Sequence, residues 1–215
     1  MAMALGDDRL FDPAHIRARL EARTVARLPG TVTRHAAVAT VVRYVGEPEV
    51  LLIRRTEHPG DPWSGHMAFP GGRHEPGDPD LRATAVRETR EEVGVDLSVH
   101  AEPLGQLDEF QALGRGAPID LAIVPFVFAL HTEVALAPND EVAEAMWAPL
   151  GPMLRGEVAA VRPYVWHGKE VALPAFRVGA HLVWGLTYRM LETLFEALSD
   201  RSPAASSVEA APVLR

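Results

Sequence analysis

Residues 82–95 read RATAVRETREEVGV, and this stretch strongly limits what the chain can fold into. It holds three glutamates within five positions, namely Glu88, Glu91 and Glu92. The pattern predicts a helix that begins near Asp80, a residue suited to cap a helix, and ends at Gly94, a residue suited to the left-handed position after the last turn. Like charges three and four residues apart destabilise a helix, and the helix dipole disfavours anions near the C-terminal end. The fold must therefore leave these carboxylates in solvent or place positive charge against them.

An apolar stripe adjoins the glutamates on the predicted helix, so they should lie at the edge of a cleft rather than on the outer face. Its members are Ala85, Val86, Thr89 and Val93. One interpretation is a solvated surface softened by Arg87 and Arg90. The other is a platform for Mg²⁺ or Mn²⁺, which prefer carboxylate oxygens. Upstream, the turn FPGG (69–72) lets the backbone approach a ligand closely and leaves carbonyl groups free to bind metal.

The rest of the chain predicts a mixed α+β fold, either a general α+β domain or an αβα sandwich, with a long C-terminal helix. β-branched runs predict strands, and turn-rich segments separate them. The expected strands are 36–45, 49–55, 67–72, 103–110, 120–130, 162–168 and 171–178, with a loop at 111–119, a strand-to-helix segment at 142–150 and the long helix at 183–198. The expected organisation is an N-terminal helical extension (1–30), one domain (31–199) and a disordered tail (200–215).

Composition excludes several classes of function. The 215 residues carry a net charge of −8, which argues against a protein that binds nucleic acid through its phosphates. The absence of cysteine excludes disulfides, thiolate metal sites and a cysteine nucleophile. No apolar run approaches the roughly 18 residues of a membrane span, and the first residues lack the basic region of a signal peptide. We therefore expect a cytoplasmic protein that binds neither nucleic acid nor membrane.

The glutamate helix and the glycine turn together resemble a known motif. Gly72, followed by the run 87–95, is similar to the Nudix box of the Nudix hydrolases, G-x5-E-x7-REUxEExGU, in which U is a bulky apolar residue. Asp78 stands where the first box glutamate would be, one residue farther from Arg87, and Thr89 takes an apolar position. This variant resembles the coenzyme A pyrophosphatase branch of the family.

Segments outside the box resemble the same branch and extend the likeness over roughly residues 35–198. They are LLIRR (51–55), SGHMAFPGG (64–72), the VPFVFAL strand and the WGLTYRML helix. The chain departs from the branch at Ile53, Trp63 and His66. The resemblance implies a Nudix-type αβα sandwich with a mixed β-sheet, a catalytic loop-helix and a long C-terminal helix. It also implies a metal-dependent hydrolase that cleaves the diphosphate of coenzyme A or an acyl-CoA.

Carried over to this chain, the resemblance assigns roles to particular residues. The implied metal ligands, for Mg²⁺ or Mn²⁺, are Glu88, Glu91, Glu92 and the carbonyl of Gly71. The implied catalytic group is Glu91, Glu92 and Arg87, with Arg87 pairing with a box glutamate or with Asp78 and so holding the loop-helix geometry. Candidates for substrate binding are Arg54, Arg55, His66 and Gly72. Besides the box glutamates, candidates for the general base are Glu109, Glu141 and Glu144.

Several alternatives stay open at this point. The substrate could be ADP-ribose, NADH or a dinucleotide in place of coenzyme A. A nucleotide-binding sensor without turnover is a second possibility, although such domains commonly lose the metal carboxylates, and all three stand here. A structural protein with a solvated helix is a third. The expected partner is a small nucleotide diphosphate, and the family resemblance makes a homodimer an option that no residue pattern here demonstrates.

Overall fold

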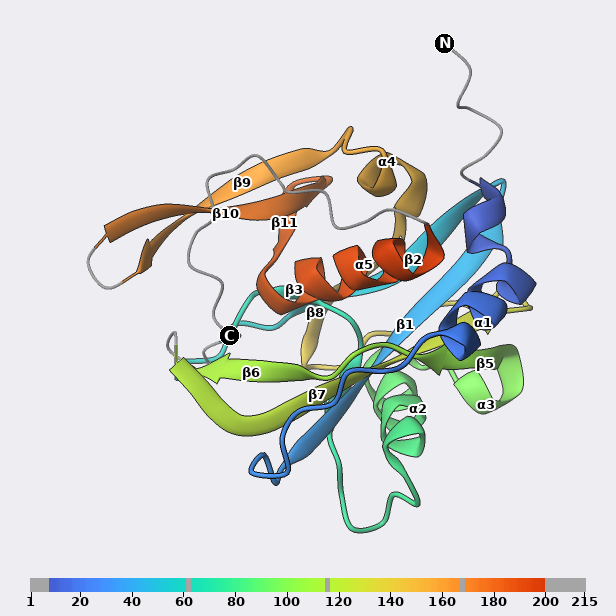
Figure 1. Ribbon diagram of the computed structural model, residues 1–215, viewed down its shortest axis with the longest axis horizontal. Helices are drawn as coiled ribbons and strands as arrows, with labels where there is room; N and C mark the ends of the chain where they lie inside the picture. Colours follow the sequence, from blue (N-terminus) through green and yellow to red (C-terminus); the bar gives the residue numbers. More distant parts are fainter. Residues whose placement is uncertain (1–7, 61–62, 115–116, 167–168, 200–215) are drawn as a thin grey trace.

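The computed structural model describes residues 8–60, 63–114, 117–166 and 169–199. Within these ranges, eight strands form a mixed sheet at the centre of the molecule (Figure 1). They are β1 (His35–Val45), β2 (Glu47–Arg55), β3 (Met67–Ala68), β4 (Gly71–Arg73), β5 (Ala101–Gln106), β6 (Phe110–Gly114), β7 (Ala117–Leu130) and β8 (Val142–Pro149). β1 and β7 pair in parallel, whereas β1 pairs with β2 and β4, and β2 with β3 and β8, in antiparallel fashion. The expected mixed sheet is confirmed.

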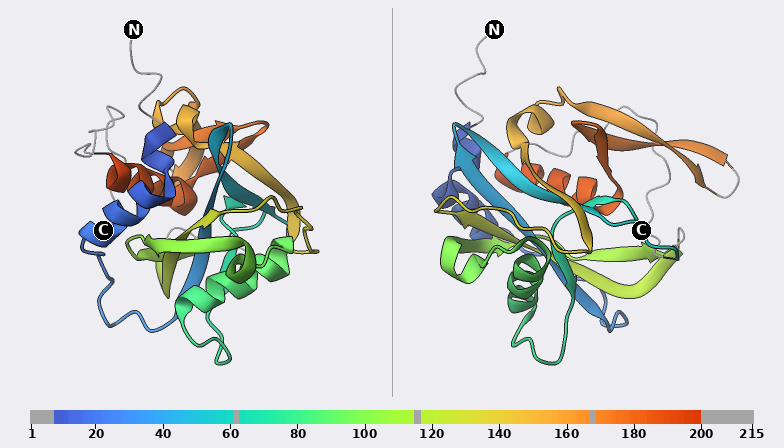
Figure 2. Two further views of the ribbon diagram at one scale, coloured as in Figure 1. Left: turned by 90° about the vertical axis from the view of Figure 1, so that its right-hand side faces the viewer. Right: turned by 180° about the vertical axis from the view of Figure 1, so that it is seen from behind.

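A smaller antiparallel sheet and the helices complete the fold. The sheet consists of β9 (Ala159–Trp166), β10 (Lys169–Val178) and β11 (His181–Trp184). The helical elements are η1 (Asp8–Phe11), α1 (Pro13–Ala22), α2 (Leu81–Val93), α3 (Leu97–His100), α4 (Leu150–Leu154) and α5 (Gly185–Leu198). Figure 2 shows α2 on one side of the central sheet, with α1 and α5 on the other. The result is the αβα sandwich of an α+β fold.

Strand β2 shows why helices cover both faces of the sheet. Val50 and Leu52 point toward α1 and α5, where they join one apolar core. Leu51 and Ile53 point the opposite way, into a second core that includes α2 and α3. All four side chains are fully buried. A strand buried on both faces reads as a continuous apolar run, as VLLI does here.

Several sequence predictions about element boundaries are wrong, and the strand expected at 67–72 is split into β3 and β4. The single strand expected at 103–110 is split into β5 and β6, and the expected loop at 111–119 is mostly strand, because β6 and the start of β7 pair as a hairpin. The long helix begins at Gly185 rather than 183, because Val183 and Trp184 pair with β10 as part of β11. In the predicted hairpin at 162–178, β9 and β10 are paired, and turn residues 167–168 lie outside the described residues.

The N-terminal segment packs against the end of the last helix. The side chain of Arg19 donates from Nε to the carbonyl of Ala197 at 2.9 Å. The ring of His15 lies 3.1 Å from the carbonyl of Leu198. These contacts satisfy carbonyls that the end of α5 leaves without intrahelical partners. The expected tail at 200–215 lies outside the described residues, and no helix in the described ranges is long and apolar enough to cross a membrane.

Candidate active site

Helix α2 begins and ends where local chemistry predicts. The carboxylate of Asp80 accepts from the amide of Ala83 at 2.7 Å, which caps the first turn. Gly94 follows the last turn with φ of 74°, and its amide donates to the carbonyl of Arg90. Ala85 and Val93 are fully buried against the sheet. This packing fixes the rotation of the helix, so that the glutamates border the buried face.

The loop before α2 is tied to the helix by an ion pair between Asp78 and Arg87. The guanidinium donates from Nε and Nη2 to the two carboxylate oxygens at 2.9 and 3.0 Å. The hydroxyl of Thr84 also donates to Asp78, at 2.9 Å. Only 6% of the Asp78 side chain is exposed, and the bonds from Arg87 hold the pKa of this carboxyl well below its usual range. Asp78, which is one methylene shorter than the glutamate of the usual box, therefore pairs with Arg87. This is one of the two pairings expected for Arg87.

Arg87 also reaches two of the three glutamates. Its Nη1 lies 3.0 Å from Oε1 of Glu88 and 3.0 Å from Oε2 of Glu91. The Glu88 side chain is 16% exposed, whereas that of Glu91 is 53% exposed. Burial raises the pKa of Glu88 despite the neighbouring guanidinium. The repulsion predicted from the sequence is thus partly offset by an arginine on the same helix.

Glu92 is the most enclosed of the three glutamates, with 3% of the residue exposed. Its Oε2 accepts from the amide of Gly71 at 2.8 Å. Its Oε1 lies 4.0 Å from Nη1 of Arg55. Burial raises the pKa of Glu92 to about 7, although the Gly71 amide and Arg55 both favour the ionised form. A positive charge placed beside this carboxylate would remove much of the cost of ionising it.

The glycine turn makes room for this arrangement. Gly71 has φ of 153°, and a β-carbon there would collide with the backbone of β1 at Ala37 and Val38. A β-carbon on Gly72 would collide with the carboxylate of Glu88. Gly71 contacts Glu92 through its amide, whereas the sequence prediction concerned its carbonyl. Two successive positions without side chains therefore bring the backbone against two of the glutamates.

The three candidates for an additional base lie in different surroundings. Burial is the main cause of the raised pKa of both Glu88 and Glu92, and repulsion from Glu141 adds to it. Glu144 lies 2.9 Å from the ring of His181. Glu109 accepts from the amide of Leu28 at 2.9 Å, which anchors the segment before β1.

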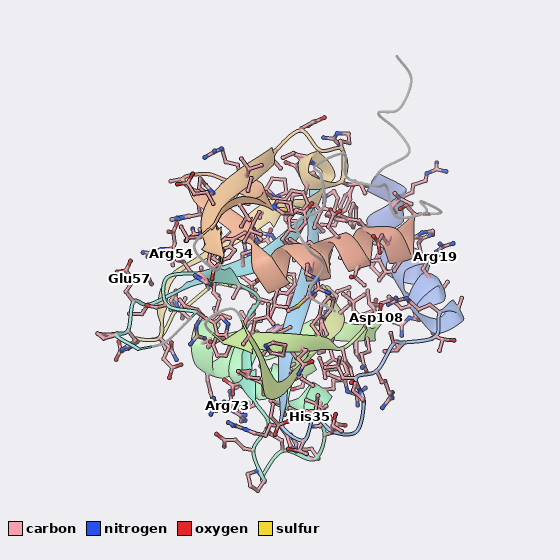
Figure 3. All side chains as sticks on the ribbon, turned by 60° about the vertical axis from the view of Figure 1, so that its left-hand side comes forward. Arg19, His35, Arg54, Glu57, Arg73 and Asp108 are labelled. Atoms are coloured by element: carbon pink, nitrogen blue, oxygen red, sulfur yellow. The ribbon has the colours of Figure 1, made fainter. Side chains whose placement is uncertain are left out.

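Figure 3 helps to separate these candidates in space. The neighbour of Glu109, Asp108, lies on the side of the molecule that carries Arg19, far from Arg54 and Glu57. Asp108 pairs with Arg23 at 2.8 Å. The 108–109 segment therefore contacts the N-terminal part of the chain.

The candidates for substrate binding are also brought into distinct places. Arg54 and Arg55 point to opposite faces of β2, where Arg54 lies 3.8 Å from Glu144 and Arg55 faces Glu92. The ring of His66 contacts that of Trp184 with centroids 4.6 Å apart. Gly72 lies against Glu88 and so belongs with the carboxylates.

The donor groups near α2 suit a hard divalent cation. Carboxylate oxygens are the ligands that Mg²⁺ and Mn²⁺ prefer, and the gap at Gly72 keeps one carboxylate close to the backbone. Within the described ranges, no three acidic or histidine side chains converge on one point as a ready cation site. The carboxylate of Glu91 instead accepts a hydrogen bond from Arg87. A cation would have to compete with Arg87 for this carboxylate.

Sequence reasoning missed two side chains near the candidate site. His181 contacts Glu144 from β11, and Arg162 of β9 stacks on Trp184 with its guanidinium carbon 4.3 Å from the ring centroid. Both contacts join strands that are distant in the sequence. The register of β9, β10 and β11 brings Arg162 to Trp184, and His181 reaches Glu144 from one sheet to the other. No local spacing could therefore reveal either contact.

A family model described as the NUDIX domain matches residues 33–166, so the chain belongs to the Nudix family. It is a Nudix pyrophosphohydrolase, an enzyme that hydrolyses a nucleoside diphosphate linked to another moiety. Enzymes of this family generally use divalent metal ions.

Two curated relatives and one solved structure illustrate the likeness. The human mitochondrial coenzyme A diphosphatase NUDT8 is 31% identical over 186 residues, covering 84% of this chain and 76% of that protein. The uncharacterised protein C14C4.10c of Schizosaccharomyces pombe is 42% identical over 113 residues, covering 51% of this chain. The chain spans only 34% of the length of that relative. The crystal structure of a MutT/nudix family protein from Enterococcus faecalis has 19% identity and a TM-score of 0.49, covering 92% of this chain and 73% of the other.

Proposed function

We propose that the enzyme hydrolyses the diphosphate of coenzyme A or an acyl-CoA. The observation that carries this proposal is the likeness to human NUDT8, a coenzyme A diphosphatase by name, over 84% of the chain. The variant box supports it, because Asp78 and Arg87 form a two-point ion pair. Hydrolysis would release 4′-phosphopantetheine and adenosine 3′,5′-bisphosphate. ADP-ribose, NADH and dinucleotides are the alternative substrates.

Glu88, Glu91 and Glu92, with the carbonyl of Gly71, would hold Mg²⁺ or Mn²⁺ in this proposal. The cation supplies charge neutralisation at the phosphoryl oxygens and a more acidic water as the nucleophile. The carboxylates fit this role by their hard oxygen donors and by the raised pKa of Glu88 and Glu92. Their protonation would decrease when a cation binds, because a positive charge favours the ionised form.

The remaining groups position the substrate and move a proton. Arg87 holds the loop and helix together through Asp78 and has no chemical step of its own. Arg55, which faces Glu92, is placed to pair with a phosphoryl oxygen of the diphosphate. Glu141 is our choice of general base, because its charge acts on Glu88 and Glu92, whereas Glu109 is engaged elsewhere.

The substrate is tested by incubating the protein with coenzyme A, ADP-ribose, NADH and diadenosine polyphosphates, each with Mg²⁺ or Mn²⁺. Products are identified by mass. We expect coenzyme A to be cleaved with the highest kcat/KM and Glu92→Gln to abolish turnover. Preference for another diphosphate would reject coenzyme A and keep the class of reaction. Nucleotide binding without turnover would instead favour the sensor.

The base is tested with Glu141→Gln. General base catalysis is worth about 100- to 10,000-fold, so kcat should fall by at least about 100-fold. KM should change little, and the acidic limb of the pH–rate profile should be altered. Glu109→Gln is the matched control and should keep full kcat. An unchanged kcat in Glu141→Gln would remove this residue from the mechanism. Light scattering would separately test the option of a homodimer.

A further inference from the structure

Arg162 carries a positive charge that no acidic side chain neutralises within the described ranges. Its guanidinium lies over the ring of Trp184, with the central carbon 4.3 Å from the centroid. Its Nε is buried and has no hydrogen-bond partner among the described residues. The arginine lies on β9, and Trp184 ends β11, on the same face of the smaller sheet. Two strands thus hold one cation against one aromatic ring.

This arrangement is suited to bind an anion. A guanidinium held flat on an aromatic face is attracted to the ring, and its N–H groups point outward in the plane. Those groups match the oxygens of a phosphate in a two-point contact. A buried donor without a partner costs free energy, so the charge of this guanidinium is not offset by the described residues around it.

The position of Arg162 connects it to the diphosphate site. Trp184 contacts the ring of His66 at 4.6 Å between centroids. The carbonyl of His66 accepts from the amide of Arg55 at 3.0 Å, and Arg55 faces Glu92. A chain of four contacts therefore leads from Arg162 to Glu92.

The hydroxyl of Thr187, near the start of α5, fixes the same junction. It donates to the carbonyl of Met67 in β3 at 3.0 Å and is buried. The start of α5, which directly follows β11, is thereby tied to the segment that leads into the glycine turn.

We propose that Arg162 is a specificity residue that binds a phosphomonoester on the sugar of the substrate, with Trp184 holding the guanidinium in place. The inference rests on the proposed function and adds to it the part of the substrate that is recognised. Coenzyme A carries a phosphomonoester on its ribose, whereas ADP-ribose and NADH do not. Arg162 would therefore separate coenzyme A from the alternative substrates.

The test compares coenzyme A with 3′-dephospho-coenzyme A, which lacks only that phosphate. The wild-type enzyme should prefer coenzyme A by about 10- to 100-fold in kcat/KM, the range of one charge-assisted contact. Arg162→Gln should bring this ratio close to one, mainly through KM for coenzyme A. Arg162→Lys keeps the charge without the fork and should retain part of the preference. Arg9→Gln removes an exposed arginine of η1 and should leave the ratio unchanged.

A binding measurement distinguishes failure of this inference from failure of the proposed function. Calorimetry on Glu92→Gln would compare adenosine 3′,5′-bisphosphate with adenosine 5′-monophosphate, and would then be repeated with Arg162→Gln added. Tighter binding of the bisphosphate that depends on Arg162 supports the inference, even if coenzyme A is not hydrolysed. Equal affinities, or a preference that survives Arg162→Gln, would overturn it and leave Arg162 with a packing role. Hydrolysis of coenzyme A with no such preference would reject the inference alone.

Discussion

Replacing Glu92 by glutamine should stabilise the metal-free protein at alkaline pH. The substitution keeps the shape of the side chain, and the amide oxygen can still accept from Gly71. It removes the charge of a residue that is only 3% exposed. Burial raises the pKa of this carboxyl from 4.5 to about 7. At 1.36 kcal/mol per pKa unit, ionisation of Glu92 in the folded state costs about 3 kcal/mol.

The direction of the pH dependence follows from proton binding. Between pH 4.5 and 7 the folded protein retains the Glu92 proton that the unfolded chain has lost. Raising the pH through this window therefore lowers the free energy of unfolding of the wild type. The stability that the protonated Glu92 side chain contributes is lost as pH rises through about 7. Glu92→Gln lacks this titration, so its stability advantage should be near zero at pH 4.5 and reach about 3 kcal/mol at pH 8.

Urea unfolding in the presence of a chelator, at pH 4.5, 6 and 8, would measure this difference. Glu91→Gln is the control, because its side chain is 53% exposed and should show no comparable gain. Adding Mg²⁺ at pH 8 should raise the stability of the wild type and have much less effect on Glu92→Gln. The reasoning fails if Glu92→Gln is less stable than the wild type at pH 8, or if its advantage is the same at every pH.

Two further predictions concern the loop and the helix around the glutamates. Gly72→Ala should lower kcat/KM by at least about 10-fold without unfolding the protein, because a β-carbon there displaces the carboxylate of Glu88. Titrating Mg²⁺ in activity assays would measure this loss. The control is Gly77→Ala, which has open space around the added β-carbon and should behave as the wild type. Arg87→Lys should lower the free energy of unfolding by roughly 2 kcal/mol, because lysine cannot make the two-point contact with Asp78. Thermal unfolding would measure this, and an unchanged midpoint would contradict it.

The elements predicted well from the sequence are those determined by local chemistry. Helix α2 carries its own cap at Asp80 and its own end at Gly94, so its limits follow from neighbouring residues. Strands β1 and β2 are apolar runs with turn residues between them. The pairing of Arg87 with Asp78 or a glutamate was expected, and both contacts occur.

The errors arose where distant parts of the chain decide the outcome. The expected strand at 103–110 breaks because the amide of Leu107 donates to Pro125 and that of Glu109 donates to Ala26. Neither partner is near in the sequence. Val183 and Trp184 fit a helix pattern as well as a strand, and the pairing with β10 decides between them.

The same limit applies to the candidate site. The spacing of the box glutamates is a local property, so the sequence predicted which helix carries them. It could not rank Glu109, Glu141 and Glu144, because their surroundings depend on loops and strands from across the fold. The degree of burial that separates Glu92 from Glu91 is likewise a tertiary property.

The parallel pairing of β1 with β7 has a consequence for the order of folding. It joins residues as far apart in the chain as His35 and Ala122, and a loop that long is costly to close early. Helix α2 lies within this loop, so it can form before the sheet that buries Glu92 is complete. Until then its glutamates remain hydrated and bind a cation only weakly. Mg²⁺ should consequently slow unfolding far more than it accelerates refolding, which stopped-flow measurements on both reactions would reveal.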